Sequence, residues 1–238
     1  MINDIEVKKM NEAGKWQRAA EVLVMMIVFG SIWGFSEATL GGFLHLVHFP
    51  YKGAIMGGIG MSIMATFVAT HRRPSLLVGL AFVAALFKPL SALIYVKPIF
   101  APFVVNPATA IILEGLTFSL VTIFIFKGFE HSIKVRVGIG LLVGYLSIIS
   151  WGTVASIMGT GNWALMGLQE KVSYALINGT ALAIIGVLLL PLGYMAGTKF
   201  WPMLLELKNM RPKFFYTFAA TTGVFCWFGA GLAFVMGL

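Results

Sequence analysis

Charged residues are scarce in this chain of 238 residues: aspartate, glutamate, lysine and arginine make up 11%, whereas 59% of the residues are hydrophobic. The mean hydropathy is +0.91. This leaves too few polar groups to cover a water-soluble globule of this length. The apolar stretches exceed about 18 residues, and their weak alternation favours helices over a membrane barrel. We therefore predict an all-α integral membrane protein.

The chain has a single cysteine, and it lacks the common catalytic motifs. Cys226 is the only cysteine, which excludes an internal disulfide and any CxxC motif. The sequence has no Walker A loop, nucleophile elbow, His-Glu-x-x-His pair or dinucleotide fingerprint. We expect no catalysis by this chain alone, no cofactor and no dedicated metal site. Nucleic acid is not an expected partner either, because the basic residues form short clusters between apolar runs.

Seven apolar segments are each near the roughly 20 residues that a hydrocarbon core of about 30 Å requires. We predict a polytopic bundle of six core transmembrane helices with a seventh, C-terminal helix. Residues 1–18 form a cytoplasmic N-terminal segment, and residues 19–238 form one transmembrane domain. The predicted spans are 19–43, 53–70, 75–96, 106–127, 135–158, 172–198 and 214–237.

The 17 basic residues indicate the orientation. With a cytoplasmic N-terminus, 13 of them lie on the inner side, including Lys8, Lys9, Lys15 and Arg18, and four lie outside or within the membrane. The positive-inside rule then predicts a cytoplasmic N-terminus and an external C-terminus. We expect a multi-pass protein of the prokaryotic cytoplasmic (inner) membrane, with the lipid bilayer as its surroundings.

Prolines suggest where helices begin or bend. Pro107 is expected to begin the fourth span, with Asn106 as its cap. Pro89 and Pro191 lie inside spans and should bend or interrupt their helices.

Three titratable groups stand near the end of the first span. On a helix, Glu37, Gly41, His45 and His48 fall within an arc of about 80° and therefore share one face. Glu37 is interpreted as a ligand-binding or proton-linked carboxylate in a cavity open to the outside, or as an ion pair that fixes helix packing. The histidines are interpreted as ligands at the mouth of this cavity or as interfacial anchors.

A row of small residues lies beside this polar face. Such rows let another helix approach closely, and they serve helix packing or a partner interface. The row consists of Gly30, Gly34, Ala38 and Gly42.

Two more charged residues lie deep in apolar sequence. Lys88 and Glu114 each cost a few kcal/mol at mid-membrane unless they are partnered. They are expected to pair with one another or to meet Glu37 and a ligand, although Lys88 has the alternative of extending to the interface. Asn106 adds hydrogen-bonding capacity. The candidate ligand-binding residues are Glu37, His45, His48, Lys88, Asn106 and Glu114.

Three segments resemble the substrate-binding S components of energy-coupling factor (ECF) transporters. They are "WGFSEATLGGFLHLVHFPYKGAIMGGIG" at 33–60, "FKPLSAL" at 87–93 and "NPATAIILEGLTF" at 106–118. These motifs cover about the first half of the chain. The second half resembles the family only in its hydropathy. It implies a six-helix bundle with a pocket near the outer face for a vitamin-like compound or a metal ion, a transmembrane coupling subunit and cytoplasmic ATPases as partners. The Ala-x-x-x-Ala face of that family is replaced here by Gly30, Gly34 and Ala38, and the seventh span is additional.

Three hypotheses for function remain at this point. The first is a substrate-binding subunit of an ECF-type transporter. The second is a membrane anchor of a redox complex, in which His45 and His48 approach a quinone or haem. The third is a secondary transporter that couples protons through Glu37 and Glu114, which inverted repeats would favour. We find no such repeat in the sequence.

Overall fold

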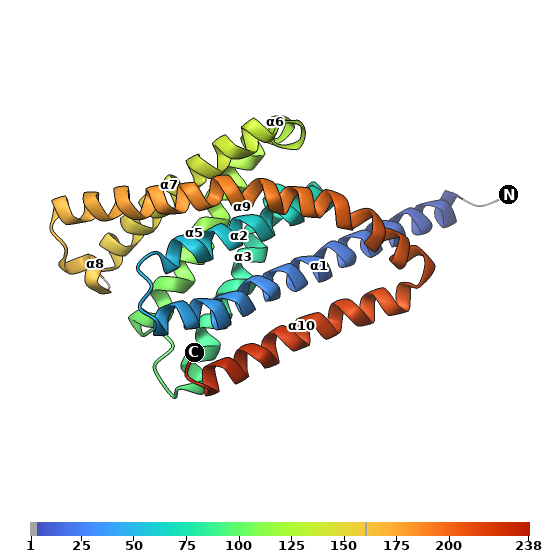
Figure 1. Cartoon of the computed structure of the whole chain (residues 1–238). Helices are drawn as coiled ribbons and strands as arrows, with labels where there is room; N and C mark the ends of the chain where they lie inside the picture. Colours follow the sequence, from blue (N-terminus) through green and yellow to red (C-terminus); the bar gives the residue numbers. More distant parts are fainter. Residues whose placement is uncertain (1–3, 160) are drawn as a thin grey trace.

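In the computed structural model, which describes the backbone of residues 4–159 and 161–238, the chain is an all-helical bundle (Figure 1). Seven helical segments are long and apolar enough to cross a membrane, as the sequence predicts. The helices are α1 (Asp4–Leu46), α2 (Lys52–His71), α3 (Leu77–Ala85), α4 (Phe87–Ile94), α5 (Pro102–Phe124), α6 (Phe126–His131), α7 (Ile133–Met158), α8 (Gly161–Leu165), α9 (Leu168–Met210) and α10 (Pro212–Val235).

The two longest helices extend well beyond a bilayer. Helices α1 and α9 have 43 residues each, or about 64 Å of helix, against about 30 Å of hydrocarbon. The predicted sixth span, 172–198, is therefore only the central part of α9. Helix α1 already begins at Asp4, although the side chains of the predicted basic residues Lys8, Lys9, Lys15 and Arg18 lie outside the described part.

The start predicted for the fourth span is wrong. Helix α5 begins at Pro102, after an extended Ala101, so Asn106 and Pro107 lie inside the helix and Asn106 does not cap it. Proline is well tolerated in the first helical turn, where its missing N–H has no partner to lose. Pro102 and Pro107, five residues apart, are thus both possible first residues of this helix, and the helix begins at Pro102.

Pro89 has the effect expected of it, because the third span is broken. Helix α3 ends at Ala85 and α4 begins at Phe87. Pro89 has no N–H, so it cannot form the helical hydrogen bond to the carbonyl of Ala85, four residues earlier. Helix α3 ends at this residue. Pro191, by contrast, lies inside an uninterrupted α9.

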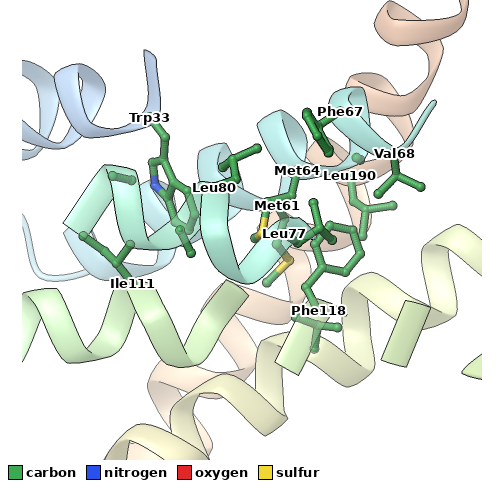
Figure 2. Close-up of a cluster of buried hydrophobic side chains, with 14 of the residues drawn as sticks. Trp33, Met61, Met64, Phe67, Val68, Leu77, Leu80, Ile111, Phe118 and Leu190 are labelled. Carbon is green, nitrogen blue, oxygen red and sulfur yellow. The ribbon is translucent and has the colours of Figure 1, made fainter. Parts of the chain in front are cut away.

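The core is a cluster of buried apolar side chains contributed by helices that are far apart in the sequence. Figure 2 shows Trp33 and Ile111 at one end of this cluster, and Phe67 and Val68 at the other. Met61 and Met64 of α2 lie between them and are fully buried. The core is therefore centred on α2, which packs against α1, α3, α5 and α9.

Glycines let α9 lie against the backbones of two neighbours. A Cβ at Gly186 would collide with Gly140 of α7 and Met61, and one at Gly193 would collide with the backbone of Ser62. The hydroxyl of Thr66 donates a 2.8 Å hydrogen bond to the Gly193 carbonyl. Small residues at seven-residue spacing thus allow the long helix to pack closely within the bundle.

Helix α10 returns along α1 after the turn at Arg211 (Figure 1). Figure 1 shows the N-terminal part of α1 and the junction of α9 with α10 at the same end of the molecule. Lys208 of α9 forms an ion pair of 2.5 Å with Glu21 of α1 at this end. The chain terminates at the opposite end, where the Tyr95 hydroxyl donates a hydrogen bond of 2.8 Å to the Leu238 carbonyl.

Candidate functional site

The charged residues of the first and third spans form an ion pair inside the bundle. Lys88 Nζ lies 3.1 Å from Glu37 Oε2, and the two side chains are only 16% and 12% exposed. The break after Ala85 begins α4 and places Lys88 in its first turn, where its side chain reaches α1. Of the alternatives left open by the sequence, Lys88 thus meets Glu37.

A second acidic group is buried on the glycine-rich surface of α2. Glu114 of α5 is 7% exposed, and its Oε1 has no hydrogen-bond partner within the described residues. A Cβ at Gly57 or Gly60 would meet this carboxylate. The absence of a side chain at both positions leaves room for the Glu114 carboxyl.

Trp33 completes this part of the site. Its side chain is fully buried, and the indole N–H has no partner among the described residues. A Cβ at Gly60 would collide with the indole ring as well as with Glu114 Oε1, so the ring and the carboxylate meet over the same residue. An unused donor and an unused acceptor thus lie close together in the interior.

The two carboxylates belong to one polar cluster, defined here as Glu37, Lys88, Glu114 and Trp33. A Cβ at Gly41 would lie 3.6 Å from Glu37 Oε2 and 3.6 Å from Met56 Cγ, and Met56 is followed in α2 by the Gly57 that borders Glu114. Glu37 and Glu114 also interact electrostatically. The cluster combines two acids with one base, which leaves one carboxyl group without an opposite charge.

The face predicted to contain both histidines is wrong for His48, because the helix includes His45 but ends before His48. Helix α1 ends at Leu46, and His48 lies in the following turn with φ = 53°. His45 is exposed, and its Nδ1 lies 2.6 Å from Lys52 Nζ. Among the described residues, no third histidine, cysteine or acidic side chain joins them in a group able to hold a metal ion. Both histidines lie at the end surface of the bundle and not in the polar cluster.

Asn106 lies apart from Glu114 on the same helix. It lies half-buried on α5, eight residues before Glu114, or about 12 Å along the helix axis. The structure therefore brings together three of the six candidate ligand-binding residues.

The row of small residues packs against other parts of this chain. Side chains at these positions would collide with Val83 of α3 at Gly30, with Phe87 of α4 at Gly34, and with the terminal Leu238 at Gly42. Ala38 is 1% exposed and packs in a small cluster with Phe87 and Ala230. This row therefore holds α1 against α3, α4 and the C-terminal helix.

Two cavities of the structure lie outside the polar cluster. One, of about 520 Å³, is bordered by Gln169, Glu170 and Tyr174 at the start of α9. The other, of about 620 Å³, lies between α1 and α10. Neither is lined by Glu37, Lys88 or Glu114.

Compared with known proteins, the chain matches no family, no curated protein and no solved structure. Its chemistry must therefore be inferred from the polar cluster itself. The cluster offers an ammonium donor, an indole donor and two carboxyl acceptors in a site from which most water is excluded. Such a set can bind a polar group of a small molecule or hold a proton.

Two features of the site were missed in the sequence. The sequence does not single out Trp33, because a tryptophan in a span is usually an interfacial or core residue. Nothing in the sequence links the glycines of "MGGIG" at 56–60 with Glu114, which lies more than 50 residues later. A dense group of glycines in one span was the available signal for a close approach by another group.

Proposed function

We propose that this chain is a membrane-embedded substrate-binding subunit that takes part in the uptake of a small molecule. The observation that carries the proposal is the charged cluster of Glu37, Lys88 and Glu114, drawn together from α1, α4 and α5. Charged groups in the hydrocarbon region are costly and typically mark the pathway of a substrate or an ion. A purely structural bundle is more simply built from apolar contacts.

The depth of the cluster supports access from the external end. Glu37 lies nine residues before the end of α1 at Leu46, which is about 13 Å along the axis. This is close to the thickness of one leaflet of hydrocarbon, about 15 Å. In the orientation expected from the basic residues, a ligand reaches Glu37 from outside without crossing the inner half of the bundle.

The partners in this proposal are a transmembrane coupling subunit and cytoplasmic ATPases of the ECF type. The chain has no nucleotide-binding motif of its own, so the energy for release of the ligand inside the cell comes from other subunits. The ligand is a vitamin-like compound or a metal ion, and the membrane is the cytoplasmic membrane of a prokaryote. The chain itself catalyses no reaction.

The test begins with native mass spectrometry of the purified protein, which identifies the ligand and subunits that co-purify. Binding of that ligand is then measured for Glu37→Gln. Loss of one charge-assisted hydrogen bond is worth about 1.5 to 3 kcal/mol, so we expect affinity to fall at least about tenfold.

The matched control is His48→Gln, because His48 is exposed in the turn beyond α1. We expect this variant to bind nearly as the unmodified protein does. Thermal unfolding of both variants separates lost binding from lost folding. Equal affinity in a folded Glu37→Gln protein would mean that the ion pair is structural and that the site is elsewhere.

One observation favours a second candidate, a proton-coupled secondary transporter. Glu114 Oε1 is buried without a partner among the described residues, and a buried carboxyl of this kind is suited to carry a proton. Reconstitution of the chain alone into liposomes distinguishes the two functions. Uptake of the co-purified ligand driven by a pH gradient, without other subunits or ATP, would support the second candidate and reject the first.

A further inference from the structure

A long groove lies between the first and last spans, apart from the polar cluster. It has a volume of about 620 Å³ and is bordered by Val24, Ile27 and Val28 of α1 and by Ala220, Gly223 and Val224 of α10. Trp227 Nε1 donates a 3.1 Å hydrogen bond to the Ser31 hydroxyl, which also borders the groove. Because these two polar groups satisfy each other, the groove offers an apolar surface to its occupant.

Small residues on α10 keep the groove open toward the lipid. A Cβ at Gly223 would have no atom within 4 Å. Phe218, Phe225 and Phe228 of the same helix are 58%, 64% and 68% exposed, so α10 faces the membrane around the groove. The occupant can therefore enter laterally from the bilayer.

Basic residues stand at one end of the groove. Arg211 and Lys213 are exposed, and neither side chain has an ion pair within the described part of the chain. The nearby Glu21 is already paired with Lys208. This end of the groove consequently has two basic residues for which the described side chains supply no ion pair.

Lys213 and the apolar groove lie on the same face of α10, and Arg211 directly precedes this helix. At about 100° per residue, Lys213, Ala220, Val224 and Trp227 fall within an arc of about 60°. Ala220 is about 10 Å and Trp227 about 21 Å from Lys213 along the axis. One leaflet with its headgroups is about 20 to 22 Å thick, so the face extends from the headgroups to the middle of the bilayer.

We propose that this groove binds an anionic phospholipid. Arg211 and Lys213 hold the phosphate of the headgroup, and one acyl chain lies along Gly223 down to Trp227. The inference is independent of the proposed uptake function, because none of these residues belongs to the polar cluster.

The first test titrates the full-length protein, delipidated in detergent, with phosphatidylglycerol or with phosphatidylcholine and counts bound lipids by native mass spectrometry. We expect phosphatidylglycerol to bind more tightly. Each basic residue near the membrane surface contributes about 1 kcal/mol, so the double variant Arg211→Gln/Lys213→Gln should bind it about 25-fold more weakly. Equal affinity for the two lipids would overturn the proposal.

The second test fills the groove. Gly223→Phe should abolish the tight phosphatidylglycerol site, whereas Gly138→Phe on α7 should keep it, because a Cβ at Gly138 also meets nothing within 4 Å. Retention of the site in Gly223→Phe would overturn the proposal. The same conclusion would follow if Gly223→Phe released a co-purifying protein subunit while lipid binding was unchanged.

A third measurement does not depend on a groove-filling variant. Phosphatidylglycerol with brominated acyl chains quenches nearby tryptophans, and we expect Trp227→Phe to remove the saturable part of the quenching. Saturable quenching that persists in Trp227→Phe would place the bound acyl chain elsewhere and reject this site.

Discussion

At the scale of single residues, the Glu37–Lys88 ion pair adds little to stability when it is intact, but the loss of either partner is costly. Removing two ions from water is expensive, so a buried pair adds little stability compared with apolar residues of the same volume. Removing one partner, however, leaves the other charge buried without compensation. The pair is therefore sensitive to any ligand that takes over one of its partners.

This asymmetry leads to a prediction for Lys88→Met. The variant leaves Glu37 unpaired, and we expect the free energy of unfolding to fall by about 3 kcal/mol. The double variant Glu37→Gln/Lys88→Met removes both charges and should recover most of this loss. Thermal unfolding in detergent measures both effects. If Lys88→Met is as stable as the unmodified protein, Glu37 does not depend on Lys88 in solution.

At the scale of helices, close approach is what holds the bundle together. Lipid tails are as apolar as the side chains that they contact, so helices associate through packing and hydrogen bonds rather than through the hydrophobic effect. The glycines of α1 and α9 serve this purpose at Gly34, Gly186 and Gly193, where a Cβ would meet a neighbouring helix. Other glycines, such as Gly138, have open space around them.

This difference predicts the outcome of two matched substitutions. Gly34→Leu forces a side chain into the ring of Phe87 and should cost about 1 to 3 kcal/mol, because overpacking displaces the helices. It should also disturb the Glu37–Lys88 pair, since Lys88 directly follows Phe87. Gly138→Leu should leave the unfolding temperature nearly unchanged. Equal unfolding temperatures for the two variants would show that α1 and α4 are not closely packed.

At the scale of the whole molecule, an odd number of spans places the two termini on opposite sides of the membrane. Seven segments of the described residues are able to cross it, and Figure 1 shows the start of α1 and the end of α10 at opposite ends of the bundle. The end with Arg72, Arg73, Arg211 and Lys213 is the basic one. The positive-inside rule makes this end cytoplasmic, which is a prediction for the living cell.

Cysteine labelling in intact cells checks this orientation. Phe100 and Met210 are 89% and 67% exposed and lie near opposite ends of the bundle. In a Cys226→Ala background, a membrane-impermeant maleimide should label Phe100→Cys and not Met210→Cys. Both should react after the membrane is permeabilised, and labelling of Met210→Cys alone in intact cells would reverse the orientation.

The class of protein and the number of spans follow from the sequence by itself. A span is a continuous run of apolar residues whose length must match the bilayer, so it can be read along one dimension. Charged residues inside such runs are equally visible, and the sequence alone marks Glu37, Lys88 and Glu114 as candidate site residues. Prolines were informative where only one position was possible, as at Pro89, and ambiguous where Pro102 and Pro107 offered two starts.

Which of these residues meet was decided only by the tertiary structure. Lys88, in the first turn of α4 after the break that follows Ala85, pairs with Glu37 of α1 and not with Glu114. His48 leaves the polar face because its left-handed backbone conformation follows the end of α1. Trp33 and Glu114 meet over Gly60 because α2 has no side chain there. Contacts of this kind depend on the rotation and depth of each helix relative to the others, and neither quantity is encoded in the periodicity of a single span.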